Sequence, residues 1–164
     1  MMTISQIKKV CDLACNRYGI NFYLDINVNA RFTRTLGRVT YDIDANNKCK
    51  PTKFELSKQL LESSTDAQVL DVVLHECAHF IAIELTGEPH NHDAYFKRIC
   101  HTIGTNNDAP STDNVNIKYR YDIFCKDCNK RISGYSRMCP TLRNLDQCYC
   151  KVCKNSNLFY IQNW

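Results

Sequence analysis

Apolar residues spaced three to four positions apart predict three helices in the first two thirds of the chain. The first covers residues 3–19 and opens with Thr3 and Gln6, which are typical of a capping box. The second covers residues 65–87, where apolar side chains surround so much of the helix that we expect it to be central and buried. The third covers residues 93–103, with its apolar residues on one face.

Alternating apolar and polar residues predict strands between the first two helices. Residues 22–28 alternate strictly and predict a half-buried strand. Residues 31–43 contain two β-rich runs interrupted by Leu36-Gly37, which predicts a hairpin, and residues 46–51 are loop-like. Residues 54–57 predict one more strand before the central helix.

The last third of the chain differs from the rest in composition. Residues 105–116 are rich in Asn, Asp, Ser and Thr, which predicts a linker. Beyond it, short aromatic segments at residues 118–124, around Tyr149 and at residues 158–161 predict small strands.

The length of the chain fits this division. Its 164 residues and 19.0 kDa suit one ordinary domain, or a domain of about 110 residues with a small appendage, and the change in composition favours the second. We therefore expect an α+β fold with a core domain at residues 1–110 and a separate module at residues 117–164.

Nothing in the hydropathy pattern predicts export or membrane insertion. The N-terminal residues 1–9 contain no apolar run of the kind that forms a secretory signal. No stretch approaches the ~20 apolar residues of a membrane span. We expect a soluble, cytoplasmic monomer without membrane contact, associated with the nucleoid if its source is a bacterium or a bacteriophage.

Eleven cysteines favour metal binding over disulfides, because thiols stay reduced in the cytoplasm. Their odd number points the same way. Cysteines that stand alone in the predicted helices are expected to be small buried hydrophobic residues. Cysteines in CxxC pairs are candidate metal ligands.

The central helix carries the strongest chemical signal, the segment His75-Glu76-Cys77-Ala78-His79. Histidines four residues apart project from one face of a helix, so His75 and His79 can bind the same metal ion. Glu76 follows the first of them and can act as a general base on a metal-bound water. The segment predicts a zinc hydrolase, although so short a motif also arises by chance.

A catalytic zinc usually has a third protein ligand. His90 and His92 both lie between the central helix and the next one, and His101 lies about 13 Å further along that helix. A ligand at the start of the third helix can fold back over the central helix, which favours His92, with His90 as the alternative.

Two CxxC pairs in the last third of the chain predict a second zinc site. They are Cys125 with Cys128 and Cys150 with Cys153, separated by 21 residues. Four thiolates would close a tetrahedral, structural site of the zinc-ribbon type, which so small a module needs in order to fold. Cys148 could replace Cys150 in principle, but a CxxC turn suits the geometry better, and we regard Cys139 and Cys148 as spare thiols.

Together these motifs resemble the SprT-like metalloprotease family. The resemblance rests on the HExxH segment, on Gly87 in the following turn, on a third histidine in an HxxxF context, on two upstream segments and on the trailing cysteine pairs. Those segments are His92-Asp93-Ala94-Tyr95-Phe96, Leu36-Gly37 and Phe54-Glu55-Leu56-Ser57.

The resemblance implies a zincin-like core made of a small sheet, the HExxH helix and the following helix, with a zinc ribbon of short strands after it. It implies His75, His79 and His92 as ligands of a catalytic zinc and Glu76 as the general base, so we expect two Zn²⁺ ions per chain. Spartan-type members of the family cleave proteins crosslinked to DNA, which implies a zinc endopeptidase with DNA-bound protein substrates and a role in DNA–protein crosslink repair.

The charge distribution is consistent with DNA as a partner. Residues 117–164 contain nine Lys/Arg and three Asp/Glu, a formal charge of +6, whereas residues 1–116 carry −2. A zinc ion with four thiolates lowers the module's charge to about +4. Basic residues can neutralise phosphates and exposed aromatic residues can stack on unpaired bases, in single- or double-stranded DNA. The basic candidates are Arg120, Lys126, Lys130, Arg131 and Arg137.

Two other functions fit the same motifs. One is a non-catalytic nucleic-acid-binding or regulatory module in which the HExxH metal is architectural. The other is a zinc hydrolase with a non-protein substrate. The presence of Glu76 favours an enzyme, because an architectural metal site does not need a base at that position.

Overall fold

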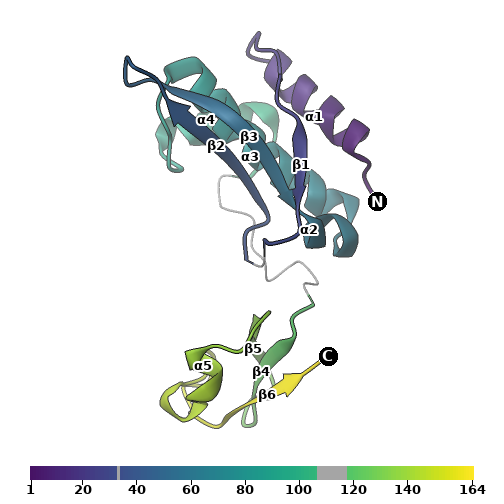
Figure 1. Cartoon of the computed structure of the whole chain (residues 1–164), viewed down its shortest axis with the longest axis vertical. Helices are drawn as coiled ribbons and strands as arrows, with labels where there is room; N and C mark the ends of the chain where they lie inside the picture. Colours follow the sequence, from purple (N-terminus) through teal and green to yellow (C-terminus); the bar gives the residue numbers. More distant parts are fainter. Residues whose placement is uncertain (33, 107–117) are drawn as a thin grey trace. The chain divides into compact units, whose positions relative to one another are not determined.

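The computed structural model describes residues 1–32, 34–106 and 118–164 (Figure 1). The chain forms two compact units, Met1–Ile117 and Lys118–Trp164. Most of the predicted linker, residues 107–116, lies outside the described residues. Within the described ranges, no helix is both long and apolar enough to cross a membrane.

The three predicted helices of the first unit are confirmed. α1 spans Ile4–Asn16, α3 spans Asp66–Thr86 and α4 spans Ala94–Ile103. A short helix, α2 (Lys58–Ser63), precedes α3. Both predicted capping boxes form, and they satisfy backbone N–H groups that have no partner inside the first turn of α1 and of α3.

A three-stranded sheet lies beside these helices. It contains β1 (Ile26–Asn29), β2 (Gly37–Ile43) and β3 (Cys49–Ser57) in the order β1-β3-β2. β3 pairs in parallel with β1 and antiparallel with β2. β2 is therefore an edge strand, and one of its long sides has no strand partner in the described part of the chain.

The predicted hairpin within residues 31–43 is wrong. The chain reverses between β2 and β3, and the described residues before Gly37 in that range form no strand. At the reversal, Oδ1 of Asp44 accepts hydrogen bonds from the N–H groups of Asn46 and Lys48, at 2.8 and 2.9 Å. Asn47 adopts a positive φ of 61°, which asparagine tolerates better than most residues.

The predicted strand at residues 22–28 forms only at its end, as β1. Phe22 and Leu24 are nevertheless buried, with 6% and 7% of their surfaces exposed. Phe22 packs against the rings of Phe54 and Phe80, with ring centroids 5.4 and 5.0 Å apart. The alternation in this segment therefore reflects side-chain burial rather than strand pairing.

Helix α3 is the centre of the first unit. It packs against α1, α4, β2 and β3 and lies behind the sheet in Figure 1. Apolar side chains from all sides of α3 are buried, as its composition predicts. Two polar residues, His75 and Glu76, are buried among them and are only 3% and 7% exposed. Such burial costs stability unless the groups have partners or a function.

The second unit is a small antiparallel sheet with two short helices. Its strands β4 (Tyr121–Cys125), β5 (Arg131–Tyr135) and β6 (Leu158–Gln162) lie in the order β5-β4-β6. The helices are α5 (Pro140–Arg143) and the 3₁₀ turn η2 (Leu145–Gln147).

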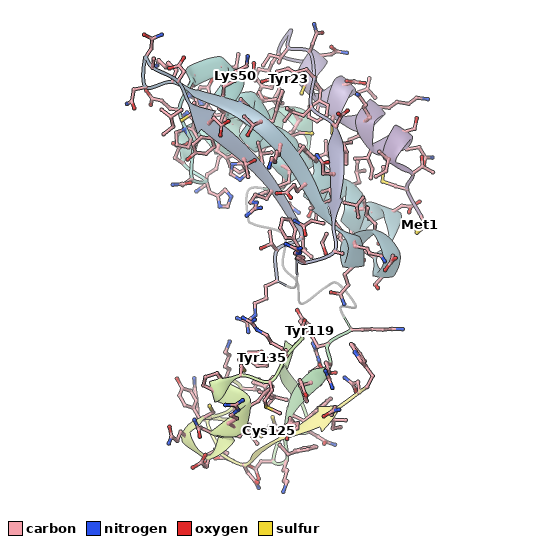
Figure 2. All side chains as sticks on the ribbon, in the orientation of Figure 1. Met1, Tyr23, Lys50, Tyr119, Cys125 and Tyr135 are labelled. Atoms are coloured by element: carbon pink, nitrogen blue, oxygen red, sulfur yellow. The ribbon has the colours of Figure 1, made fainter. Side chains whose placement is uncertain are left out.

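This unit has only a small apolar core. The buried members of that core are Tyr121, Ile123 and Leu142. Tyr119 packs so tightly on Gly134 that a Cβ atom there would overlap its ring (Tyr119 is labelled in Figure 2). The sequence pattern did not predict β5. The strand expected around Tyr149 does not form, and that residue lies in an irregular segment before Cys150.

Candidate metal centres

Three histidine side chains converge in the first unit. His75 and His79 lie on successive turns of α3, and His92 lies two residues before α4. Nε2 of His92 is 3.1 Å from Nε2 of His75 and 3.1 Å from Nε2 of His79. Ligands on a tetrahedral zinc ion with Zn–N distances of 2.0–2.1 Å are separated by roughly 3.3 Å, so the three nitrogens suit a common ion.

Burial keeps two of these imidazoles in the form that binds metal. Burial, and to a smaller extent the neighbouring His92, lower the pKa of His75 to about 4. Burial also lowers the pKa of His79 to about 3, with smaller contributions from His75 and His92. Both rings are therefore neutral at physiological pH and offer a lone pair to a cation.

His75 and His79 differ in the hydrogen-bond partner of their second ring nitrogen, the one that is not close to His92. The backbone carbonyl of His90 accepts a hydrogen bond from the ring of His79. Nδ1 of His75 is buried and makes only a weak contact with the backbone of Asn106, short of normal hydrogen-bond geometry. Hydrogen bonds of this kind fix the orientation and the tautomer of a metal-binding histidine.

A buried carboxylate lies beside the three histidines. Glu76 is on α3, faces β2, and accepts a hydrogen bond from the backbone N–H of Val39. Burial raises the pKa of Glu76 to about 7, and the Val39 hydrogen bond and the charge of Arg38 oppose that rise. A group with a pKa near neutrality can accept and return a proton under physiological conditions.

The histidines and Glu76 open onto a cleft of about 370 Å³. One wall is β2 with the segment before it, including Gly37 and Tyr41. The opposite side is formed by α3 and by the segment from Pro89 to His92. The site is therefore accessible from solvent along an edge strand of the sheet.

His90, the alternative third ligand, lines the same cleft but has other partners. Its Nδ1 is 2.7 Å from Oδ2 of Asp93, and its Nε2 is 3.2 Å from Oγ1 of Thr86. The structure thus brings His92, and not His90, together with His75 and His79. Glu84, on the last part of α3, accepts a hydrogen bond from the hydroxyl of Tyr23 and is not part of the cluster (Tyr23 is labelled in Figure 2).

The four paired cysteines form a second cluster, in the second unit. The Sγ atoms of Cys125 and Cys153 are 3.5 Å apart, and those of Cys128 and Cys150 are 3.6 Å apart (Cys125 is labelled in Figure 2). All four sulfur atoms lie within 4.8 Å of one another. A tetrahedral zinc ion with Zn–S distances of about 2.3 Å separates its ligands by roughly 3.8 Å, so this cluster also suits zinc.

Backbone N–H groups support the cysteine cluster. They lower the pKa of Cys150 to about 6, with the hydrogen bond from Cys153 contributing most. A thiolate at this position is the form that binds zinc. Cys148 lies outside the cluster, and its Sγ is 3.6 Å from the carbonyl oxygen of Asn144. Cys139 packs against the small core of the second unit.

The basic residues predicted to contact DNA differ in their surroundings. Arg131 forms an ion pair with Asp122 at 2.7 Å and lies over the ring of Tyr119. Nε of Arg120 donates a hydrogen bond to the carbonyl oxygen of Trp164 at 3.0 Å. The remaining three are exposed, and they are Lys126, Lys130 and Arg137.

Sequence reasoning missed three groups that shape the first site. Gly37 was interpreted as a break between strands, yet it packs directly on Glu76. The N–H of Val39 and the carbonyl of His90 are backbone groups, which no residue type encodes. A glycine inside a β-rich run was the one usable signal, because it can mark a close approach of backbone to another group.

Comparison with known proteins agrees with the predicted resemblance. The profile of the SprT-like family matches residues 7–120. The chain is 31% identical over 115 residues to the Protein SprT-like of Lactiplantibacillus plantarum, covering 67% of this chain and 70% of that protein. It is 24% identical over 142 residues to the Protein SprT-like of Staphylococcus epidermidis, covering 86% and 85% of the two chains. No solved structure matches significantly. This chain therefore belongs to the SprT-like family.

Proposed function

We propose that this protein is a zinc-dependent endopeptidase with a zincin-like core. The observation that carries the proposal is the convergence of three histidine nitrogens beside the buried carboxylate of Glu76, on the floor of an open cleft. His75, His79 and His92 would hold the zinc ion. When bound, zinc activates water and polarises a peptide carbonyl.

Glu76 performs the proton transfers in this mechanism. Its carboxylate accepts a proton from the attacking water and then delivers that proton to the leaving amine. The N–H of Val39 holds the carboxylate at the edge of β2, and Gly37 leaves the space that it occupies. Both groups restrict the motion of the base before substrate binds, which favours proton transfer in the correct geometry.

The burial of Glu76 favours catalysis over a purely architectural metal site. A carboxylate that is 7% exposed costs stability, and its pKa of about 7 reflects that cost. An architectural site with three imidazole ligands gains nothing from such a group. A general base, by contrast, needs a position close to the metal and a pKa near neutrality.

The second unit supports a structural role for the second zinc. Its small core cannot stabilise a fold of this size without a metal or another crosslink. Cys125, Cys128, Cys150 and Cys153 would supply four thiolates and leave no coordination position for water.

We assign proteins bound or crosslinked to DNA as the substrates. The resemblance to Spartan-type members of the family is the main support for this assignment. The positive charge of the second unit adds to it, together with exposed aromatic side chains such as Tyr149 and Trp164, which are 61% and 62% exposed.

A cleavage assay with a crosslinked substrate tests this function. The wild-type protein, loaded with two equivalents of zinc, is incubated with a protein crosslinked to DNA and with the same protein alone. We expect internal cleavage of the crosslinked protein at a higher rate. Equal rates with and without DNA would leave a zinc endopeptidase but remove DNA-bound proteins as its substrate class. A chain that binds two zinc ions and cleaves neither substrate would support the non-catalytic alternative.

A further inference from the structure

The side chain of His90 connects two helices next to the three-histidine site. Its Nδ1 donates to the carboxylate of Asp93, the residue that caps α4, at 2.7 Å. Its Nε2 bonds at 3.2 Å to the hydroxyl of Thr86, the last residue of α3. The ring also stacks on Tyr95, with centroids 4.7 Å apart. His90 is thus fixed to the end of one helix and to the start of the next.

Both partners of His90 are themselves held in place. Oγ1 of Thr86 donates to the carbonyl of Ala82 at 2.7 Å and accepts from the N–H of Glu88 at 3.1 Å. Oδ1 of Asp93 accepts from the N–H groups of Tyr95 and Phe96, at 2.9 and 3.0 Å. The side chain of His90 therefore lies between two rigid points, and its backbone has little freedom to move.

That backbone serves two of the three candidate metal ligands. The carbonyl of His90 accepts a hydrogen bond from the ring of His79. Two residues later, His92 adopts a positive φ of 56°, a conformation that L-residues with side chains rarely adopt. A backbone conformation of this kind persists only where its surroundings impose it.

We propose that His90 is a positioning residue for the metal centre, which orients His79 through its carbonyl and holds His92 in place through its side-chain bonds to Thr86 and Asp93. Partners that orient a metal ligand commonly change metal affinity 10–100-fold when they are lost. His90 itself stays outside the coordination sphere, because both of its ring nitrogens have other partners.

A metal-competition titration tests this role. The role of His90 rests on the proposed zinc site. The titration measures the transfer of Zn²⁺ from the protein to a chromophoric chelator. We expect His90→Ala to weaken the three-histidine site by about 10–100-fold and to leave the four-cysteine site unchanged. Co²⁺ absorption distinguishes the two sites, since only the four-cysteine site gives thiolate charge-transfer bands. His90→Gln should recover much of the affinity, because its amide can bond to both Asp93 and Thr86.

The controls separate positioning from ligation. His101→Ala removes an exposed histidine in the last turn of α4 and should have no effect. His92→Ala should abolish binding at the site. Unchanged affinity in His90→Ala overturns the proposal, and so does a loss as complete as in His92→Ala, which would make His90 a ligand.

Two further measurements keep the test decisive. Circular dichroism of the metal-free variants shows whether His90→Ala folds. If it does not, Thr86→Val removes one of the two anchors while keeping the ring, and weakening without unfolding is again expected. If the wild-type protein binds zinc only at its cysteines, the proposed function fails. If the wild-type and His90→Ala proteins bind zinc equally at both sites, only the role of His90 fails.

Discussion

Gly37 and Glu76 are in such close contact that no side chain fits between them. A Cβ atom at Gly37 would lie 2.7 Å from Cγ and 3.0 Å from Oε1 of Glu76, and 3.0 Å from Cγ1 of Val72. The N–H of Val39, two residues further along β2, bonds to the same carboxylate. The edge of the sheet therefore determines where the proposed base lies.

Gly37→Ala should impair catalysis while leaving zinc bound. The added methyl group must displace Glu76 or β2, and a displacement of about 1 Å at a catalytic group can cost about 100-fold in rate. We expect that loss in kcat with two zinc ions still present by metal analysis. Thr40→Ala, on the same strand but bonded to Thr52, is the matched control and should retain activity. A fully active Gly37→Ala protein would show that Glu76 is not held in this way.

Gly37 also shows why part of the fold could not be predicted from sequence. A glycine in a β-rich run is typical of a turn and predicts a hairpin at that position. The need for glycine comes instead from contact with Glu76, which is far away in sequence. The actual turn is marked by Asp44 and Asn47, of which only Asn47 lies in the segment predicted as a loop, residues 46–51. At Gly37, the packing against Glu76 therefore outweighed the tendency of glycine to mark a turn.

Local chemistry explains the features that were predicted well. The N-terminal ends of α1 and α3 follow from capping boxes at Thr3 and Thr65, which act within four residues. The convergence of His75 with His79 follows from helix periodicity alone. The position of His92 depends on a bend that no periodicity encodes, so spacing could favour it over His90 but could not decide between them.

The stability of the metal-free protein should depend on the ionisation of Glu76. Its pKa rises from 4.5 to about 7 on folding, so the folded state binds this proton more tightly than the unfolded chain. The stabilisation from this group is fully present below pH 4.5 and is lost as the pH rises through 7. Glu76→Gln carries no such dependence.

Denaturation of metal-free wild-type and Glu76→Gln proteins at several pH values measures this effect. The free energy of unfolding of the variant, relative to wild type, should increase by about 3 kcal/mol between pH 4.5 and pH 8. His75 and His79, whose pKa values are lowered, destabilise both proteins at acidic pH, so comparing the two removes most of their contribution. A difference that does not change with pH would contradict the burial of the Glu76 carboxylate.

Cys125→Ser should remove one zinc ion and unfold the second unit only. Limited proteolysis reports this change, because cleavage should then occur within residues 118–164 while the first unit stays intact. We also expect a fall from two zinc ions to one. Cys148→Ser is the control, because Cys148 lies outside the cluster, and it should retain both ions. Loss of zinc in the control would mean that Cys148 is a ligand.

Three exposed basic residues should account for part of the salt dependence of DNA binding. Each phosphate contact contributes about 0.9 to the slope of log K against log salt on duplex DNA. Replacing Lys126, Lys130 and Arg137 with Gln should therefore reduce the slope by up to about 2.7. The same change at three exposed lysines of the first unit, Lys8, Lys9 and Lys50, should have little effect. Weak binding by the wild-type protein that is insensitive to salt would contradict DNA as a partner.

Cleavage by the Glu76→Gln protein decides whether Glu76 is the base of a zinc endopeptidase. Wild-type and variant proteins, each shown by metal analysis to hold two zinc ions, are incubated with the same DNA-crosslinked protein, and the products are identified by mass spectrometry. We expect internal peptide-bond cleavage by the wild type and none above background by the variant. Equal cleavage by the two proteins would show that Glu76 is not the base.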